Sequence, residues 1–491
     1  MEYPTNIYLS PFHTSIYRES MISDKGISIK FLLFLLVCVY VSGDDAEVRC
    51  IAREREALLS FKNGLIGDDG ILSTWRSDEC CEWYGVECSN TTRHVIALQL
   101  NTCDLEGVLQ GEVPDCWEKM PYLSSLNLAD NSFSGEIPRS FGSLLHLIAL
   151  QLRGNNLSGE LPSTLRLCQE LELIDVGGNE LTGEIPTWID ELFGMVFLNL
   201  HRNKFHGSIP GRICNLTRIR ILDLSINKLF GKIPDCFNNF TALAQLNTIQ
   251  AQRWVGYYYV FQHNGNLPNK KFRPIYAYSA IQWKGQESEY RKNLPLLKLI
   301  DFSSNSLIGN IPKSFSSMLG LISLNLSRNS LTGNIIGDIG EMEMLECLDL
   351  SHNQFSGELP TSLAQLQYLA VLDLSNNDLS GKIPTSTQLQ SFNASAYDEN
   401  DGLCGPPLAS CPEDSLRPST TNPNEKDDNS LSFMQEVCIS LGFGFIFGFW
   451  GVVGTFILKK SWRIAYFNFW DDVGDWFYVR IGVFVSKWRR S

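Results

Sequence analysis

The 491-residue chain lacks an excess of positive charge. It has 40 Lys and Arg residues against 54 Asp and Glu residues, which gives a formal net charge of −14. Proteins that bind nucleic acid usually carry a strongly basic surface, because the phosphates of DNA and RNA are anionic. We therefore expect no nucleic acid among its partners.

Motifs of catalysis and metal binding are missing as well. None of the seven histidines has HExxH or zinc-finger spacing, and no GxSxG nucleophile motif occurs. Residues 459–491 contain no Gly-rich phosphate loop, HRD or DFG, so they hold no kinase signature. We predict a protein that is not an enzyme and has no cofactor and no metal site.

Long hydrophobic runs are rare, and the first is short. Phe31–Val41 is an apolar run that follows Lys25 and Lys30 and precedes two small residues. It is too short to cross a bilayer and fits the apolar region of a signal peptide, which predicts a signal peptide with a long leader over residues 1–43. Either translation starts at Met21 or the leader is overlong. An uncleaved anchor is the alternative.

The second run, Cys438–Leu458, contains no charged residue and as a helix would span about 30 Å, the thickness of a bilayer core. Lys459, Lys460 and Arg463 follow it, and acidic residues precede it, so we expect one transmembrane helix with a cytoplasmic C-terminus. Gly444, Gly448 and Gly451 would form a small face for helix packing. Glycine that is merely tolerated in a membrane helix is the alternative.

What the chain has in abundance is a repeat. The frame LxxLxLxxNxLxGxIP first appears clearly at Leu123–Pro138, and its asparagine then recurs at steps of 24 residues (155 − 131). A fixed period between 20 and 29 with this leucine spacing predicts a leucine-rich-repeat solenoid, in which stacked coils bury leucines that one coil cannot bury alone. The asparagine ends each short strand, and its amide can bond the backbone of the neighbouring coil. The anchor asparagines are Asn131, Asn155, Asn179, Asn203, Asn227, Asn305, Asn329, Asn353 and Asn377.

The extension LxGxIP, as in Leu157–Pro162 and Leu379–Pro384, resembles the plant subclass of extracellular leucine-rich repeats. The segment ending in CEWYGVEC at Cys88 and the tail Ser461–Val479 resemble plant leucine-rich-repeat receptor-like proteins, of the kind that includes xylanase-elicitor and fungal-effector receptors. The resemblance implies an α/β horseshoe of plant-type repeats with disulfide caps. With about ten repeats, the chain would be a shortened member.

The repeats are interrupted once. Asn227 and Asn305 are 78 residues apart (305 − 227), which leaves 54 residues beyond one repeat. This aromatic and charged stretch resembles the island of the same family, and long insertions in compact domains are usually functional or disordered. The predicted segments are therefore 1–43 signal peptide, 44–92 N-terminal cap, 93–234 repeats, 235–297 island, 298–386 repeats, 387–412 C-terminal cap, 413–437 acidic linker, 438–458 membrane helix and 459–491 tail.

Cysteines and glycosylation motifs indicate an extracellular face. Cys214 and Cys236 are about one repeat apart, which suits a disulfide between coils stacked about 4.8 Å apart. The family resemblance implies Cys50–Cys80, Cys81–Cys88 and a C-terminal cap with Cys404 and Cys411, whereas Cys116, Cys168 and Cys347 are expected to be packing residues. Six glycosylation sequons lie between the two hydrophobic runs, at Asn90, Asn156, Asn215, Asn239, Asn325 and Asn393.

Candidate ligand-binding residues follow from the frame. The residues six, four and two before each anchor asparagine should face outward on the concave side, where most coils carry Asp or Ser. Side chains that depart from this pattern are free to specify a ligand. They are Ala149, Gln151, Arg153, Phe197, Asn199 and His201, with Arg202 beside them. Surface variation without a role is the alternative.

These observations and the resemblance together predict a kinase-less receptor at the plasma membrane, single-pass, with the repeats outside. The resemblance implies an extracellular protein, peptide or glycan elicitor as ligand, and signalling in plant defence. It also implies an adaptor leucine-rich-repeat receptor kinase bound through the membrane helix and a co-receptor kinase of the somatic-embryogenesis type. A developmental peptide receptor, or a truncated decoy or enzyme-inhibitor-like binding protein, remains an alternative.

Overall fold

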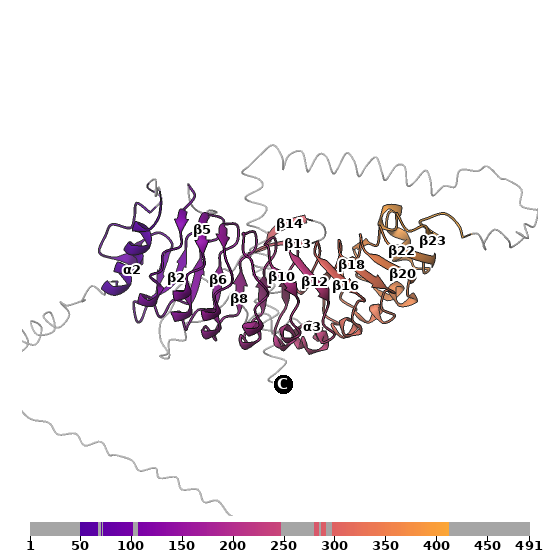
Figure 1. Ribbon diagram of the computed structural model, residues 1–491, viewed down its shortest axis with the longest axis horizontal. Coiled ribbons are helices and arrows are strands. Elements are labelled where there is room, and N and C mark those ends of the chain that lie inside the picture. Colours follow the sequence, from indigo (N-terminus) through magenta and orange to yellow (C-terminus); the bar gives the residue numbers. More distant parts are fainter. Residues whose placement is uncertain are drawn as a thin grey trace, which may run out of the picture. The chain divides into compact units, whose positions relative to one another are not determined.

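The computed structural model describes residues 50–66, 70, 72–101, 107–246, 279–283, 286–290 and 297–411. Over these residues the chain forms a solenoid of stacked coils that runs from the N-terminal cap to the C-terminal cap (Figure 1). The leucine-rich-repeat solenoid predicted from the sequence is thereby confirmed.

One long sheet has a strand from every coil. The strands are short because only the residues between two core leucines are extended, and their middle residues, such as Leu126 and Leu348, are fully buried. Antiparallel pairing at the N-terminal cap gives way to parallel pairing from β2 onwards. In order the strands are β1 (Val86–Cys88), β2 (Val95–Gln99), β4 (Ser125–Asn127), β6 (Ala149–Gln151), β8 (Leu173–Asp175), β9 (Phe197–Asn199), β11 (Ile221–Asp223), β15 (Leu299–Asp301), β17 (Ser323–Asn325), β19 (Cys347–Asp349) and β21 (Val371–Asp373).

A second set of parallel strands follows the anchor asparagines. One sheet contains β3 (Gln110–Glu112), β5 (Ser132–Glu136) and β7 (Asn156–Ser158). The other contains β10 (His206–Ser208), β12 (Lys228–Lys232), β16 (Ser306–Gly309), β18 (Ser330–Gly333), β20 (Gln354–Glu358), β22 (Asp378–Lys382) and β23 (Gly402–Cys404).

The expectation of an α/β horseshoe was wrong in one respect. Opposite the main sheet the described coils make 3₁₀ turns, such as η4 (Arg139–Ser143), and among them only one adds a single α-helical turn, α3 (Thr241–Ala244). Pro138 stands immediately before this turn, and five residues are too few for a stable α-helix. The other turns are η3 (Trp117–Lys119), η5 (Ser163–Leu167), η6 (Thr187–Glu191), η7 (Gly211–Asn215), η8 (Phe237–Asn239), η11 (Lys313–Ser317), η12 (Ile339–Glu341) and η13 (Thr361–Gln365).

The anchor asparagines join consecutive coils. The Asn353 Nδ2 donates to the Leu326 carbonyl of the preceding coil at 3.0 Å and to the Leu350 and Ser351 carbonyls of its own coil. Its Oδ1 accepts from the Leu331 N–H, also of the preceding coil, at 3.0 Å. The bond from Nδ2 to the preceding coil recurs at Asn131, Asn155, Asn179, Asn203, Asn227, Asn305, Asn329 and Asn377, and at Asn400 of the C-terminal cap.

The insertion does not interrupt this ladder. β11 pairs directly with β15, and the Asn305 Nδ2 donates to the Leu224 carbonyl at 3.0 Å across the inserted chain. The predicted first boundary at residue 235 was too early. Phe237, Phe240 and Leu243 are fully buried, so the coil continues through η8 and α3 (Thr241–Ala244) before the inserted segment begins. Within the insertion, β13 (Ser279–Trp283) and β14 (Gln286–Tyr290) form an antiparallel hairpin.

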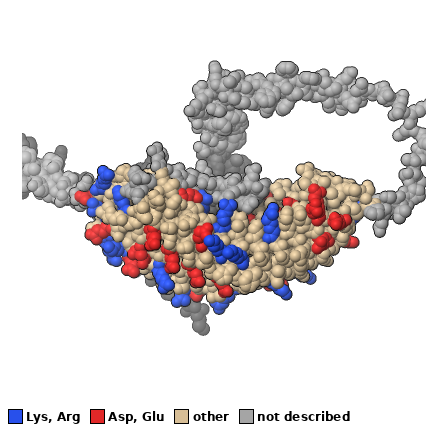
Figure 2. All heavy atoms as spheres, turned by 45° about the horizontal axis from the view of Figure 1, so that its top comes forward, with Lys and Arg blue, Asp and Glu red and all other residues tan. Residues whose placement is uncertain are grey.

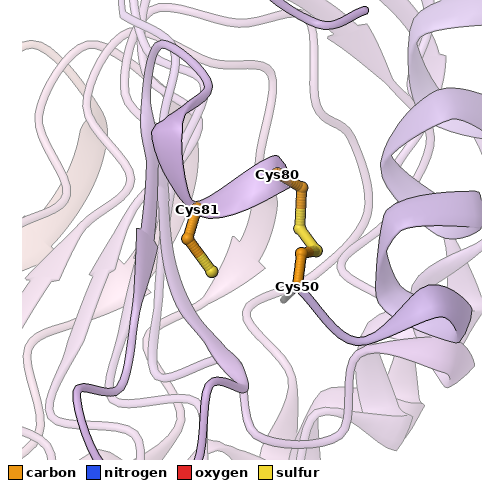
Figure 3. Close-up of side chains that lie close together, drawn as sticks. All are labelled: Cys50, Cys80 and Cys81. Carbon is orange, nitrogen blue, oxygen red and sulfur yellow. A yellow bond between two sulfur atoms is a disulfide. The ribbon is translucent and has the colours of Figure 1, made fainter. Parts of the chain in front are cut away.

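Disulfides close both ends of the solenoid and staple its middle. The structure joins Cys50 to Cys80, Cys81 to Cys88, Cys214 to Cys236 and Cys404 to Cys411, which are the four pairs expected from the sequence. The sulfurs of Cys50, Cys80 and Cys81 lie within 4.8 Å of one another (Figure 3). Because all three are engaged in disulfides, they offer no thiolate to a metal ion.

The caps have elements of their own. The N-terminal cap contains α2 (Ala52–Asn63) and η1 (Cys80–Glu82), and the C-terminal cap contains α4 (Thr387–Ser391) and η14 (Ala394–Ala396). Across the described residues, no helix has the length and apolar character needed to cross a membrane. The predicted signal peptide, acidic linker, membrane helix with Gly444, Gly448 and Gly451, and tail lie outside the described residues, as does most of the island.

The ladder makes a direct stability prediction. Changing Asn353 to Ala should lower the free energy of unfolding by about 3 kcal/mol or more, because it leaves backbone groups of two coils without a partner, at about 1–3 kcal/mol for each. Asn334 is exposed and serves as the matched control, since Asn334→Ala should have little effect. Chemical denaturation of the two variants measures the difference, and equal stabilities would refute the role of the ladder.

Candidate functional site

A pair of glycines hollows the concave surface at the end of β8. Gly177 and Gly178 occupy the two positions before Asn179. The position of Gly177 is held by Arg153 and His201 in the neighbouring coils, and that of Gly178 by Gly154 and Arg202. Because the coil between them has no side chains here, Arg153 lies on one side of the hollow, and His201 and Arg202 lie on the other. The resulting cavity has a volume of about 300 Å³ and is lined by Asp130, Arg153, Gly154, Asn155, Gly177, Gly178, Asn179, Glu180, Asn199, His201 and Arg202.

The backbone explains which of the two glycines the fold requires. The residue before each anchor has a left-handed conformation, with φ of +63° at Gly178 and +48° at Arg202. Glycine adopts this conformation without strain, and other residues adopt it at a cost. Gly177 has no such constraint, and several later coils carry Ser at its position, for example Ser327 and Ser351. Gly177 is thus the residue that leaves the hollow open without being needed by the backbone.

Charges of both signs surround the hollow. The Arg153 guanidinium lies 2.9 Å from an Asp130 carboxylate oxygen and 3.9 Å from one of Asp175. Arg202 and Glu180 complete the rim. Arginine presents five N–H donors in a planar fork, and an adjacent carboxylate adds acceptors. The site can therefore bind a polar ligand that carries both donors and acceptors.

Beside the hollow, His201 is part of a series of hydrogen-bonded side chains that extends along the sheet. The His201 Nδ1 lies 2.7 Å from the Ser225 Oγ, and this hydroxyl donates to the Asp223 carboxylate. In a catalytic triad the aspartate would hold the opposite ring nitrogen of the histidine. Here Asp223 lies 3.9 Å from the same Nδ1, so the arrangement orients His201 and does not relay a proton.

The structure separates the predicted ligand-binding residues into two groups. Arg153, Asn199, His201 and Arg202 line the hollow. Gln151 is 1% exposed and Phe197 is 0% exposed. Sequence spacing predicts that both face outward on the concave side, but their side chains are buried and not accessible to a ligand.

Phe197 belongs to an apolar cluster distinct from the main core. The first residues of β6, β8, β9, β11 and β15 stand opposite one another in register and build this cluster together with Val196 and Leu297. The glycine pair, Asp130 and Glu180 were not among the predicted residues. The two consecutive glycines before an anchor asparagine are the sequence signal that identifies the hollow.

Comparisons with known proteins agree with the repeat frame. Residues 51–89 match the leucine rich repeat N-terminal domain, and residues 122–144, 146–168, 218–240, 296–318, 320–342, 344–366 and 368–389 match the Leucine Rich Repeat. Receptor-like protein EIX2 of Solanum lycopersicum is 56% identical over 239 residues, which are 46% of this chain and 23% of that protein. Receptor-like protein EIX1 of the same species is 55% identical over 45% of this chain and 22% of that protein. The chain is similar to the plant leucine-rich-repeat receptor-like proteins.

The matched region of the chain spans less than a quarter of either relative. Among solved structures, a plant ice-binding protein is 29% identical with a TM-score of 0.56 over 74% of this chain and 98% of that one. The Arabidopsis receptor kinase HAESA, solved with the peptide hormone IDA and the co-receptor SERK1, is 27% identical with a TM-score of 0.51 over 68% of this chain and 47% of that one. The same solenoid thus serves different functions, and the fold alone does not name the ligand.

The predicted glycosylation sites differ in exposure. Asn90, Asn156, Asn215, Asn239 and Asn393 are exposed. Asn325 is half-buried in β17, where its Nδ2 donates to the Asp301 carboxylate at 3.1 Å and its Oδ1 accepts from the Ser327 N–H. A glycan is attached at Nδ2. The Nδ2 of Asn215 also donates to a carboxylate, that of Asp190 at 3.0 Å, but Asn215 is exposed, so Asn325 differs from it by its burial in a strand.

Burial shifts the pKa of two thiols and one carboxyl group. It raises the pKa of Cys116 to about 11 and that of Cys168 to about 12, so both are protonated and unreactive at neutral pH, as packing residues are. The pKa of Asp301 is raised to about 7, first by burial and then by the charge of Asp223. Cys347, the third cysteine expected to be a packing residue, is buried too.

We predict that intact glycopeptide mass spectrometry of the secreted repeats will find glycans at Asn90, Asn156, Asn215, Asn239 and Asn393 and none at Asn325. The reason is that Asn325 is half-buried within β17, whereas the other five asparagines are exposed. Asn325→Gln should leave the glycoprotein mass unchanged, whereas Asn393→Gln should reduce it. A glycan found on Asn325 would mean that β17 opens before the protein is secreted.

Asp301 gives a pH prediction. Its pKa is higher in the folded state than the ordinary value of 3.8, so the folded state binds more protons between these two values. Stability from this group is therefore present at low pH and is lost as the pH rises towards 7. Asp223→Asn removes a neighbouring charge and should make the free energy of unfolding fall less between pH 5 and pH 7.5 than in the unchanged protein. If the free energy of unfolding fell equally with pH in the variant and in the unchanged protein, the prediction would be wrong.

Proposed function

We propose that this chain is a kinase-less cell-surface receptor that binds an extracellular elicitor on the concave face of its repeats and signals in plant defence through a partner receptor kinase. The observation that supports it most is the hollow at Gly177 and Gly178, because four residues that depart from the repeat frame line a single cavity. The similarity to Receptor-like proteins EIX1 and EIX2 supports a role as a receptor.

The ligand class that suits the hollow is polar and small at its point of contact. Arg153 and Arg202 offer donors, whereas Asp130 and Glu180 offer acceptors. A side chain or chain end of a protein or peptide, or a sugar residue of a glycan, has both kinds of group. The larger part of such an elicitor would lie along the neighbouring strands.

Signalling would require partners. Residues 459–491 carry no kinase signature, so we propose an adaptor leucine-rich-repeat receptor kinase held through the membrane helix 438–458, with Gly444, Gly448 and Gly451 as its packing face. A co-receptor kinase of the somatic-embryogenesis type would join when ligand binds. HAESA, solved with the co-receptor SERK1, is the structural precedent for such a complex.

A developmental peptide receptor is the second candidate. It is supported by the likeness to HAESA, which was solved with a peptide hormone. A decoy or an inhibitor-like binding protein would use the same hollow but would need no kinase partner. The three candidates differ in the response that binding produces, so signalling in living tissue distinguishes them.

The test fills the hollow. Gly177→Ser places a side chain where a Cβ would lie 3.0 Å from the Asn199 Nδ2, at a position where other coils already carry Ser. Expressed as the full chain in leaves, this variant should reach the cell surface and lose at least about tenfold in its response to a fungal xylanase preparation, since blocking one central contact is worth more than 1 kcal/mol.

Gly337→Ser is the matched control, because nothing lies within 4 Å of the Cβ that it adds. It should respond like the unchanged chain. A full response from Gly177→Ser at equal surface level would exclude the hollow as the elicitor site. Elicitor binding without any response in the unchanged chain would favour the decoy.

A further inference from the structure

A second surface, on the outward face of β10, β12 and β16, has features that the fold does not require. Side chains alternate along β12, so that Leu229 is buried while Lys228, Phe230 and Lys232 are exposed. Parallel pairing sets His206 of β10 opposite Lys228, and Ile308 of β16 opposite Lys232. Neighbouring strands are about 4.8 Å apart, so these five side chains form one patch, here called the β12 patch.

The apolar members of the β12 patch are exposed without structural need. Phe230 is 54% exposed and Ile308 is 48% exposed. Three earlier coils carry Ser134, Ser158 and Thr182 at this position, and each hydroxyl donates to a glycine carbonyl of the preceding coil. Phe230 and Ile308 give up that bond and leave apolar surface in water, which is a mark of an interaction site.

Ile226, next to β12, adds an apolar side chain. It has a φ of +51°, a left-handed conformation that disfavours β-branched side chains, and it is 36% exposed. The repeat frame imposes this conformation on every residue before an anchor asparagine, so the unusual feature here is the exposed isoleucine and not the backbone. An isoleucine here extends the exposed apolar surface towards the anchor asparagine.

The patch itself carries two lysines although the chain as a whole is negative, and Glu184 lies opposite His206 at its edge. Within the described residues Lys228 and Lys232 form no ion pair, whereas the nearby Lys204 is paired with Glu180. Figure 2 shows basic side chains gathered near the middle of the face in view, with acidic side chains to either side.

We propose that the β12 patch, with Ile226, is a docking surface for an acidic segment of a partner protein that carries an apolar side chain. Lysines beside exposed aromatic and aliphatic groups match carboxylates beside an apolar anchor. Aliphatic side chains such as Ile308 offer little to an anionic polysaccharide, which favours a protein partner. The surface is separate from the hollow at Gly177, so it does not depend on the proposed elicitor site.

The experiment measures binding of a short synthetic peptide, in which Glu alternates with Leu and Phe, to the full chain solubilised in detergent. Three comparison probes are the same peptide with Lys for Glu, the same peptide with Ser for Leu and Phe, and an oligogalacturonate of similar charge. The first peptide should bind in a salt-dependent manner and the others at least about tenfold more weakly, because each lacks one of the two features.

Two double variants locate the binding. Lys228→Glu with Lys232→Glu reverses the charge, and Phe230→Ser with Ile308→Ser introduces the residue that other coils carry at this position, so the second variant should fold normally. Each should weaken peptide binding at least about tenfold. Lys313→Glu, on η11, is the charge control and should bind like the unchanged chain.

Three results would overturn the proposal. Unchanged peptide binding in both double variants would place the site elsewhere. Stronger binding of the oligogalacturonate than of the acidic peptide would assign the surface to a polysaccharide. Absence of measurable binding by the acidic peptide would show that the lysines and the apolar side chains do not act together.

Discussion

The side-chain amide of one asparagine in each coil is the interaction on which the rest of this structure depends. Each amide donates to carbonyls of its own coil and of the coil before, and its oxygen accepts a backbone N–H of that preceding coil, as at Asn353. Since buried backbone groups need partners, this side chain sets how far the chain turns before the next 3₁₀ segment. The fixed geometry holds the concave strands in register. A side chain that departs from the repeat frame therefore lies beside the equivalent side chains of the neighbouring coils.

The fold was largely predictable because its determinants repeat. Period, core leucines, anchor asparagines and the looped-out insertion all follow from spacing, and the ladder across Asn305 shows that 54 residues can be inserted without disturbing it. The 3₁₀ turns were missed because the family description, rather than the five residues after each proline, supplied the helices. The boundary at residue 235 was missed because Phe237 and Phe240 fill core positions that leucine usually fills.

The candidate site was predictable only in part. Spacing identifies which side of a strand a residue lies on, and Arg153 and His201, which it selected, line one hollow. It does not reveal whether that side is covered, so Phe197 was expected to be accessible although it is buried in a cluster with its neighbours on adjacent strands. The hollow at Gly177 and Gly178 exists because glycine has no side chain. A search of the sequence for side chains that could bind a ligand does not find it.

The central claim is that the repeat frame is constant for stability while the departures at the end of β6, β8 and β9 bind the ligand. Hydrogen exchange of the full chain tests it most directly, when measured with and without an elicitor to which leaves that express the chain respond. The account predicts that elicitor slows exchange in residues 149–155, 173–180 and 197–203 and leaves 323–329 and 347–353 unchanged. Protection confined to the later coils, or spread evenly over the solenoid, would contradict it.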